Sequence, residues 1–219
     1  KELKHIETLQ NELLVAPNDL LALNCNEILV SNDHYTSNIL FGLSHDLVKV
    51  RSADLTYYDG KNWNNLNKKV AFGNGLILHK DQTRNKEVLI RSSSADFSLL
   101  TYDITRSKDN NKFLESIDSV VSDEVLPFSP DNIEHDVNTG NIIITGHHST
   151  TLFLGHAIFR TNAPSVVIEY KSPNNYETLY YDDGTELSAA SVATRTKDKK
   201  KLYIGQVFNP YILVCVNPE

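Results

Sequence analysis

The sequence predicts an all-β protein built from propeller blades, and three observations support this prediction. Short apolar runs rich in Val, Ile, Leu and Tyr recur along the chain, separated by turns that contain Gly, Asn and Asp. A polar residue opens each unit, at Asn18, Asn74, Asp131 and Ser191, so the units are 56, 57 and 60 residues apart. Repeats of this length with three or four strands are typical of propeller blades, which bury their faces against neighbouring blades.

The strands of each unit follow from these runs. In chain order the expected strands cover residues 20–23 and 27–31, then 76–78, 87–91 and 98–102, then 131–133, 141–145, 152–154 and 166–170, and finally 191–194, 202–205 and 211–214. Residues 36–50 interrupt the first unit. A short helix is predicted there, with one apolar face formed by Leu40, Phe41, Leu43, Leu47 and Val48. A β-sandwich is the alternative fold, which the regular repeat disfavours.

Length and composition limit the function classes. The chain has 219 residues, 40% of them apolar and 22% charged, which fits one folded domain over residues 1–219. The net charge of −7 argues against a nucleic-acid surface and against a polybasic membrane patch. No apolar run reaches the roughly 18 residues of a membrane span.

The number of repeats and the cysteines add two expectations. About four units do not close a ring by themselves, and the chain begins at Lys1, so we expect an open arc whose other blades lie in preceding sequence. Cys25 and Cys215 are far apart and fit no zinc motif. From the residues alone we expect two buried free thiols.

The polar residues that open the units predict a cation site. In a propeller the innermost strands meet near one axis, so Asn18, Asn74, Asp131 and Asn132 are expected to converge there. Their amide and carboxylate oxygens suit Ca²⁺, which takes about 6–8 oxygen ligands, and do not suit zinc. The alternative is that these residues only start strands after turns.

Several motifs resemble the paraoxonase (arylesterase/lactonase) family of six-bladed propellers. They occur in the family's order and close to its spacing over nearly the whole chain, and they cover about the C-terminal two-thirds of the family pattern. The matching segments are residues 18–20, 31–35 (SNDHY), 72–75 (FGNG), 131–133 (DNI), 138–140, 184–185, 191–193 and 204–208.

The resemblance implies a metal-dependent hydrolase. Asn18, Asn74, Asp131 and Asn132 would bind the family's catalytic calcium, and Asp19 a second, structural calcium. The catalytic calcium would polarise the carbonyl of a lactone or aryl ester while a base activates water. Hydrolysis would therefore depend on Asp131 as the one carboxylate of the four.

The resemblance also implies the residues of a substrate pocket. His147 corresponds to a pocket-lining position and is a candidate catalytic residue, and His34 lies in the matched NDHY motif. Phe72, Val207 and Phe208 would give the pocket apolar walls that accept many esters.

Parts of the family pattern have no match in this chain. They are a Glu and an Asp calcium ligand, the His pair usually assigned to water activation, and the partner of the half-cystine that Cys215 matches. The resemblance thus implies that Cys215 pairs outside this segment, in the secretory pathway or outside the cell, and that Cys25 stays a free core thiol. A propeller that binds calcium but acts as an assembly or chaperone scaffold without turnover is the alternative function.

Overall fold

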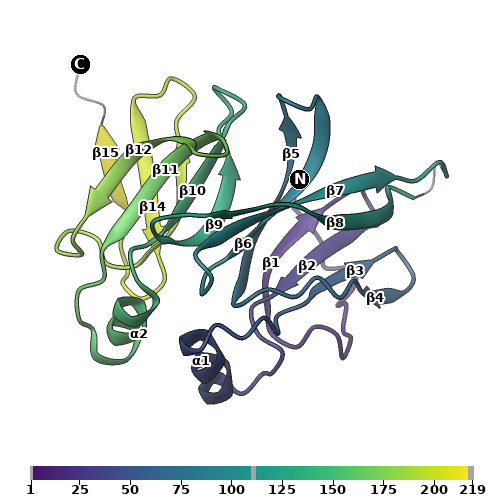
Figure 1. The fold of residues 1–219 in the computed structure, drawn as a ribbon, viewed down its shortest axis with the longest axis horizontal. Coiled ribbons are helices and arrows are strands. Elements are labelled where there is room, and N and C mark those ends of the chain that lie inside the picture. The colour runs from purple at the N-terminus through teal and green to yellow at the C-terminus, as the bar shows by residue number, and fades with distance from the viewer. Residues whose placement is uncertain (1, 110–111, 217–219) are drawn as a thin grey trace.

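The protein forms four antiparallel sheets arranged as blades of a β-propeller (Figure 1). The computed structural model describes residues 2–109 and 112–216, and in helix α1 it does not describe the side chains of residues 39–41 and 43. Blade 1 contains β1 (Pro17–Ala22), β2 (Ile28–Asn32), β3 (Leu55–Tyr58) and β4 (Trp63–Asn65), and blade 2 contains β5 (Gly73–Asp81), β6 (Lys86–Ser93), β7 (Ser98–Arg106) and β8 (Leu114–Val125). Blade 3 contains β9 (Ser129–His135), β10 (Ile142–His147), β11 (Ser165–Ser172) and β12 (Asn175–Asp182), and blade 4 contains β13 (Ala190–Arg195), β14 (Lys201–Gln206) and β15 (Leu213–Val216).

The blades pack side by side through their first strands. Strand β1 contacts β5, β5 contacts β9, and β9 contacts β13, so these four strands form the inner edge of the arc. Each junction between blades has its own apolar cluster: one includes Leu29, Leu76 and Leu89, the next Ile77, Leu99, Ile133 and Ile144, and the third Ile143, Val167, Ala193 and Ile204. The blades are therefore stabilised by their neighbours, as the repeat in the sequence predicts.

The two ends of the arc keep apolar side chains in contact with solvent. Leu20 on β1 is 64% exposed, and Val214 and Val216 on β15 are 48% and 65% exposed. Blade 4 also has three strands among the described residues. These faces differ from the three junctions, where the equivalent apolar surface is covered.

Two helices lie at the same end of the molecule (Figure 1). Helix α1 (Ile39–Leu47) follows β2, where a helix was predicted, and contacts α2 (Thr150–Phe159), which follows β10. Leu47 and Val48 are 57% and 70% exposed, and the other three residues of the predicted apolar face have undescribed side chains. Neither helix, among the described residues, is long and apolar enough to cross a membrane.

Helix α2 corrects one predicted strand. Residues 152–154 were expected to form a strand, but they lie in α2, where the Ser149 side chain accepts a hydrogen bond from the Leu152 N–H and caps the first turn. The helix ends at Arg160, whose backbone is left-handed with φ 57°. A run of three apolar residues fits a helix turn as well as a strand, and the cap decided between them.

The cysteine prediction was wrong for Cys25. This residue is exposed in the turn between β1 and β2, where Asn24 Oδ1 accepts hydrogen bonds from the backbone N–H groups of Asn26 and Glu27. The turn is held by these polar contacts and does not need an apolar side chain. Cys215 is half-buried on β15 and packs beside Leu179 and Tyr180 of blade 3.

Candidate functional site

All four inner strands carry a β-bulge at the predicted oxygen donors. The pairing of each inner strand with its neighbour shifts register at this point, between Pro17 and Asp19, between Gly73 and Leu76, opposite Asp131 and Asn132, and between Ala190 and Val192. The bulged residues therefore include Asn18, Asn74, Asp131, Asn132 and Ser191. A bulge leaves its extra residue unpaired and turns the side chain out of the ladder, and bulges are frequent next to active sites.

Close backbone approach brings the donors of different blades together. A Cβ atom at Gly75 would lie 2.7 Å from the Ile133 nitrogen and 2.9 Å from the Asp131 carbonyl oxygen, so only glycine lets β5 come this near to β9. On the other side of β5, the Leu76 N–H donates to Asp19 Oδ2 over 2.7 Å. Asp19 thus connects blade 1 to blade 2 at the level of the bulges.

The two asparagines of the inner cluster use their nitrogens and keep their oxygens free. Asn74 donates through Nδ2 to Ser94 Oγ at 3.4 Å, and its Oδ1 is buried with no hydrogen-bond partner among the described residues. Asn132 donates through Nδ2 to the carbonyl and hydroxyl oxygens of Ser191, at 3.0 and 3.3 Å. Both amides are therefore oriented with an oxygen available to a ligand.

Asp131 is the carboxylate of this cluster. Burial and the negative charge of Asp19 together raise its pKa to about 7, although hydrogen bonds from Asn74 and Ser191 act to lower it. Burial also raises the pKa of Asp19, in spite of the N–H donors of Leu76 and Leu20. Glu134, an exposed residue of the same strand, has a pKa raised by partial burial of its carboxyl group and by the charge of Asp19.

This cluster fits a hard divalent cation. The buried, unpartnered Asn74 oxygen is a polar atom that costs free energy unless a ligand meets it. The oxygen of Asn132 and the carboxylate of Asp131 add donors that Ca²⁺ prefers. Among the described residues, no group of three or more His, Cys, Asp or Glu side chains could hold a metal, so a cation here would need the amide oxygens as ligands. Asn18 is exposed, and no described hydrogen bond joins it to Asn74 or Asp131.

His34 and Phe72 form one wall beside the cluster. The His34 ring is held between Asp33 (2.8 Å) and Asp46 of α1 (2.9 Å) and stacks on Phe72 with 5.1 Å between ring centroids. Burial acts to lower the His34 pKa, but the two carboxylates outweigh it and raise the pKa to about 9. Phe72 has φ 57°, a left-handed conformation that is rare for a bulky residue, and it directly precedes the bulged β5.

His147 belongs to a second, aromatic wall. His147 pairs with Ser129 of β9, which precedes Asp131 by two residues. Its ring stacks on Phe153 of α2 with 4.3 Å between the ring centroids. The rings of Phe153 and Phe208 lie 5.8 Å apart between centroids, so Phe208, a predicted pocket residue, belongs to the same aromatic group. Val207, the other predicted pocket residue of this segment, is 62% exposed. Burial lowers the His147 pKa to about 3, and neither ring nitrogen has a described hydrogen-bond partner. Phe153 was missed because its segment was interpreted as a strand.

Comparison with known proteins identifies the family. The family model described as Arylesterase matches residues 1–215. This chain belongs to the Arylesterase family. The match includes all the inner strands and both walls of the candidate site.

The curated relatives of this Arylesterase family chain share about a quarter of their aligned residues with it. It is 24% identical over 220 residues to "Serum paraoxonase/lactonase 3" of Oryctolagus cuniculus, with 99% of this chain and 58% of that protein aligned. It is 25% identical over 214 residues to "Serum paraoxonase/arylesterase 2" of Rattus norvegicus, with 94% and 55% aligned. The human "Serum paraoxonase/lactonase 3" is 24% identical, with 95% and 56% aligned. The chain thus spans little more than half the length of these relatives.

Proposed function

We propose that the protein is a calcium-dependent hydrolase of lactones and aryl esters. The single observation that carries the proposal is the recurrence of a β-bulge at an oxygen-bearing residue in all four inner strands. Membership of the Arylesterase family and the names of its relatives, which contain "lactonase" and "arylesterase", support the reaction class. The same names contain "Serum", which supports a protein of the secretory pathway or the extracellular space.

The metal would be held by oxygen atoms. Asn74, Asp131 and Asn132, with Asn18 from blade 1, would hold the catalytic Ca²⁺, and Asp19 would take part in a second, structural site. A bound Ca²⁺ supplies Lewis-acid polarisation of a carbonyl oxygen and stabilisation of the oxyanion. Ser94 and Ser191 would position the two amides, since they accept hydrogen bonds from the Asn74 and Asn132 nitrogens.

The two walls would orient the substrate and exclude water. Phe72, Phe153 and Phe208 offer apolar surface to an aryl or lactone ring. His34 has a raised pKa of about 9, so it is protonated at neutral pH and suits a positioning role. His147 has a pKa lowered to about 3, so its neutral ring can donate or accept a hydrogen bond but is a weak proton acceptor. Activation of water would require a base from outside this chain, together with blades that cover the exposed faces of β1 and β15.

The test uses full-length protein on phenyl acetate and a simple lactone, with and without a calcium chelator. We expect the chelator to abolish turnover and added Ca²⁺ to restore it. Asp131→Asn should lower kcat/KM by at least about 100-fold, because it removes the only carboxylate among the four proposed ligands of the catalytic metal. Asn74→Ala should have a smaller effect.

The matched control is Asp183→Asn, an exposed turn position where the new amide oxygen can still accept the Thr185 N–H. This variant should retain wild-type turnover. Turnover that persists in chelator would contradict the metal mechanism. Calcium binding without turnover on either substrate would contradict the hydrolase and favour a non-catalytic scaffold.

A further inference from the structure

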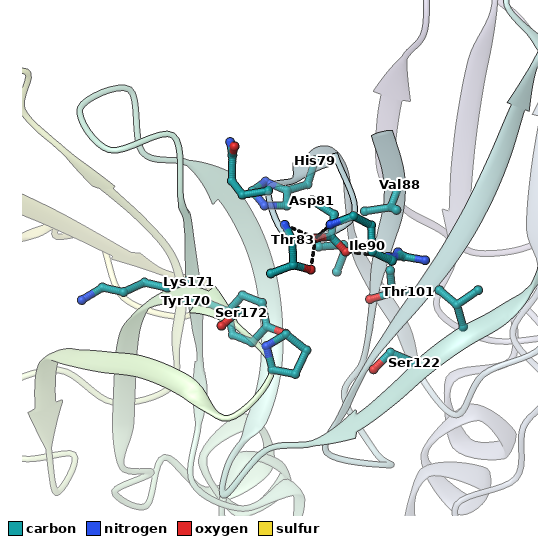
Figure 2. Close-up of a pocket in the computed structure, with 14 residues that line it drawn as sticks. His79, Asp81, Thr83, Val88, Ile90, Thr101, Ser122, Tyr170, Lys171 and Ser172 are labelled. Carbon is teal, nitrogen blue, oxygen red and sulfur yellow. Dashed lines mark hydrogen bonds and ion pairs between the residues drawn. The ribbon is translucent and has the colours of Figure 1, made fainter. Parts of the chain in front are cut away.

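A pocket opens between blades 2 and 3 (Figure 2). It has a volume of about 330 Å³, at the lower end of the ~300–1,000 Å³ typical of small-molecule sites. His79 lines it and lies on β5 five residues beyond Asn74, which is roughly 17 Å along a strand. The pocket is therefore separate from the proposed metal site.

His79 is the buried polar group of this pocket. Its side chain lines the pocket, the residue is 8% exposed, and its ring has no hydrogen-bond partner among the described residues (Figure 2). Burial and the nearby His135, whose ring centroid is 6.4 Å away, lower the His79 pKa. The ring is thus neutral at pH 7 and offers one N–H donor and one acceptor nitrogen. Its nitrogens are not among the fully buried unpartnered atoms of the described residues, so they are open to water or to a ligand in the pocket.

The remaining surface is apolar with two further hydroxyl groups. Val88 and Ile90 of β6 are 1% and 3% exposed and form the floor. Thr101 and Ser122 lie directly opposite each other on β7 and β8, and neither hydroxyl has a hydrogen-bond partner in the described structure. Both side chains line the same space as His79 (Figure 2). The pocket therefore combines an apolar floor with several free uncharged polar groups.

The wall from blade 3 is fixed before any ligand binds. The Tyr170 hydroxyl donates to Glu124 Oε2 at 2.5 Å, and the Asn174 N–H donates to Glu124 Oε1 at 2.7 Å. Glu124 lies on β8, so these two bonds connect the β11–β12 hairpin to blade 2. A preformed pocket binds with a smaller entropy cost than one that must close on its ligand.

The charged groups at the rim already have partners. Arg84 pairs with Asp81 at 2.7 Å and with Asp103 at 2.8 Å, and Lys171 pairs with Glu177 at 3.3 Å. A charged ligand would have to compete with these pairs for a counter-charge. The pocket therefore favours an uncharged ligand.

We propose that this inter-blade pocket binds a small, uncharged aromatic alcohol, with its ring on Val88 and Ile90 and its hydroxyl on the His79 ring. The probe is 2-naphthol, whose fluorescence reports binding, and the matched ligand is naphthalene, which lacks the hydroxyl. We expect full-length protein to bind 2-naphthol at least about tenfold more tightly than naphthalene, since one hydrogen bond to a buried group is lost. The proposal does not depend on hydrolase activity.

Variants locate the ligand. Ser122→Trp should fill the pocket and abolish binding, while Ser119→Trp, at an exposed position of the same strand, should leave it unchanged. His79→Leu should weaken 2-naphthol binding about tenfold and leave naphthalene binding unchanged. His148→Leu, an exposed histidine of blade 3, is the matched control. Unchanged binding in Ser122→Trp, or equal affinity for the two ligands, would overturn the proposal.

A measurement on the unmodified protein does not depend on how the variants fold. With ¹³C-labelled histidine, 2-naphthol should shift the His79 ring resonance in a saturable way and leave the exposed His5 and His148 unaffected. A saturable shift at His147 or His34 without one at His79 would place the ligand in the candidate hydrolase site and overturn the proposal.

Discussion

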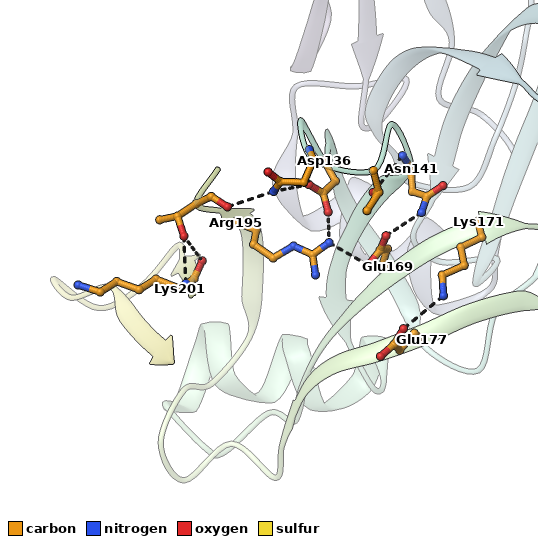
Figure 3. Close-up of polar contacts among 10 residues, drawn as sticks. Asp136, Asn141, Glu169, Lys171, Glu177, Arg195 and Lys201 are labelled. Carbon is orange, nitrogen blue, oxygen red and sulfur yellow. Dashed lines mark hydrogen bonds and ion pairs between the residues drawn. The ribbon is translucent and has the colours of Figure 1, made fainter. Parts of the chain in front are cut away.

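Two junctions between blades each contain an arginine, and the partners that compensate its charge differ between the two junctions. At the junction of blades 1 and 2, Arg91 is fully buried and donates to the carbonyl oxygens of Lys68 (2.6 Å), Asn32 and Asp54 (both 3.1 Å). At the junction of blades 3 and 4, Arg195 pairs with the carboxylates of Asp136 and Glu169 (Figure 3).

The pKa values of the two guanidinium groups reflect this difference. Burial lowers the pKa of Arg91 to about 10, because carbonyl dipoles compensate the buried charge only in part. Burial acts in the same direction on Arg195, but hydrogen bonds and charges from Asp136 and Glu169 outweigh it and raise its pKa. The first junction therefore uses carbonyl oxygens, which do not titrate, and the second uses carboxylates, which take up protons in acid.

The largest effect is expected for Arg91→Met. It leaves three carbonyl oxygens and the Ser31 hydroxyl, which accepts from Nε at 3.1 Å, without their donor in a buried junction. We expect a loss of about 4 kcal/mol in the free energy of unfolding. The loss should stay constant from about pH 4.5 to pH 9, because no partner changes charge. Urea unfolding followed by the fluorescence of Trp63, in blade 1, measures it.

Arg195→Met should cost about 3 kcal/mol at pH 7, since it leaves two buried carboxylates without their cation. In the wild type, burial raises the pKa of Asp136 and of Glu169, but Arg195 and amide donors outweigh it and hold both below the usual value. Their stabilisation is present above the ordinary carboxyl pKa of about 4 and is lost as pH falls through the lowered value.

The variant should therefore approach the wild type in acid. Without Arg195 the buried carboxyls take up protons more readily, so the difference in unfolding free energy should shrink between about pH 6 and pH 4. Urea titrations at both pH values measure this. A difference that does not change with pH would contradict the comparison.

Lysine replacements sharpen the comparison. Arg195→Lys keeps a positive charge between two carboxylates and should cost about 1 kcal/mol. Arg91→Lys should cost more, because an ammonium group cannot reach three carbonyl oxygens and a hydroxyl in the planar geometry of guanidinium. Equal losses in thermal unfolding would show that charge, and not geometry, dominates at Arg91.

The smallest effect serves as a control. Lys171 and Glu177 form an exposed ion pair at 3.3 Å, which Figure 3 shows together with the contacts of Arg195. Lys171→Ala should change the free energy of unfolding by less than about 0.5 kcal/mol. A larger effect would mean that exposed ion pairs on the blade surface contribute more to the free energy of unfolding than their exposure predicts.

The sequence allowed much of this fold to be predicted, since the inner strands and the helix at residues 39–47 follow from apolar periodicity and repeat length. The periodicity did not reveal the bulges at Asn18, Asn74, Asp131 and Ser191, because a register shift arises from pairing with a neighbouring strand. Helix α2 was missed because its apolar run is short.

The donor cluster could be predicted from the sequence, whereas the contacts between blades could not. Asn74 and Asp131 were identified because they recur at a fixed position in the repeat. The buried state of Arg91 and the free ring of His79 depend on contacts between blades, such as the carbonyl oxygens of Asn32 and Asp54. Such contacts leave no local pattern in the sequence.

The repeated bulges have a consequence for how such a protein can change over evolution. Every oxygen donor lies on an inner strand, whereas His34, Phe72 and Phe208 lie on segments that connect strands. Insertions or exchanges in these connections would alter the shape and polarity of the walls without moving the donors. The proposed function therefore implies that substrate range and metal affinity would be encoded in separate parts of the chain, and a variant library confined to residues 33–38 and 207–212 should diversify one while preserving the other.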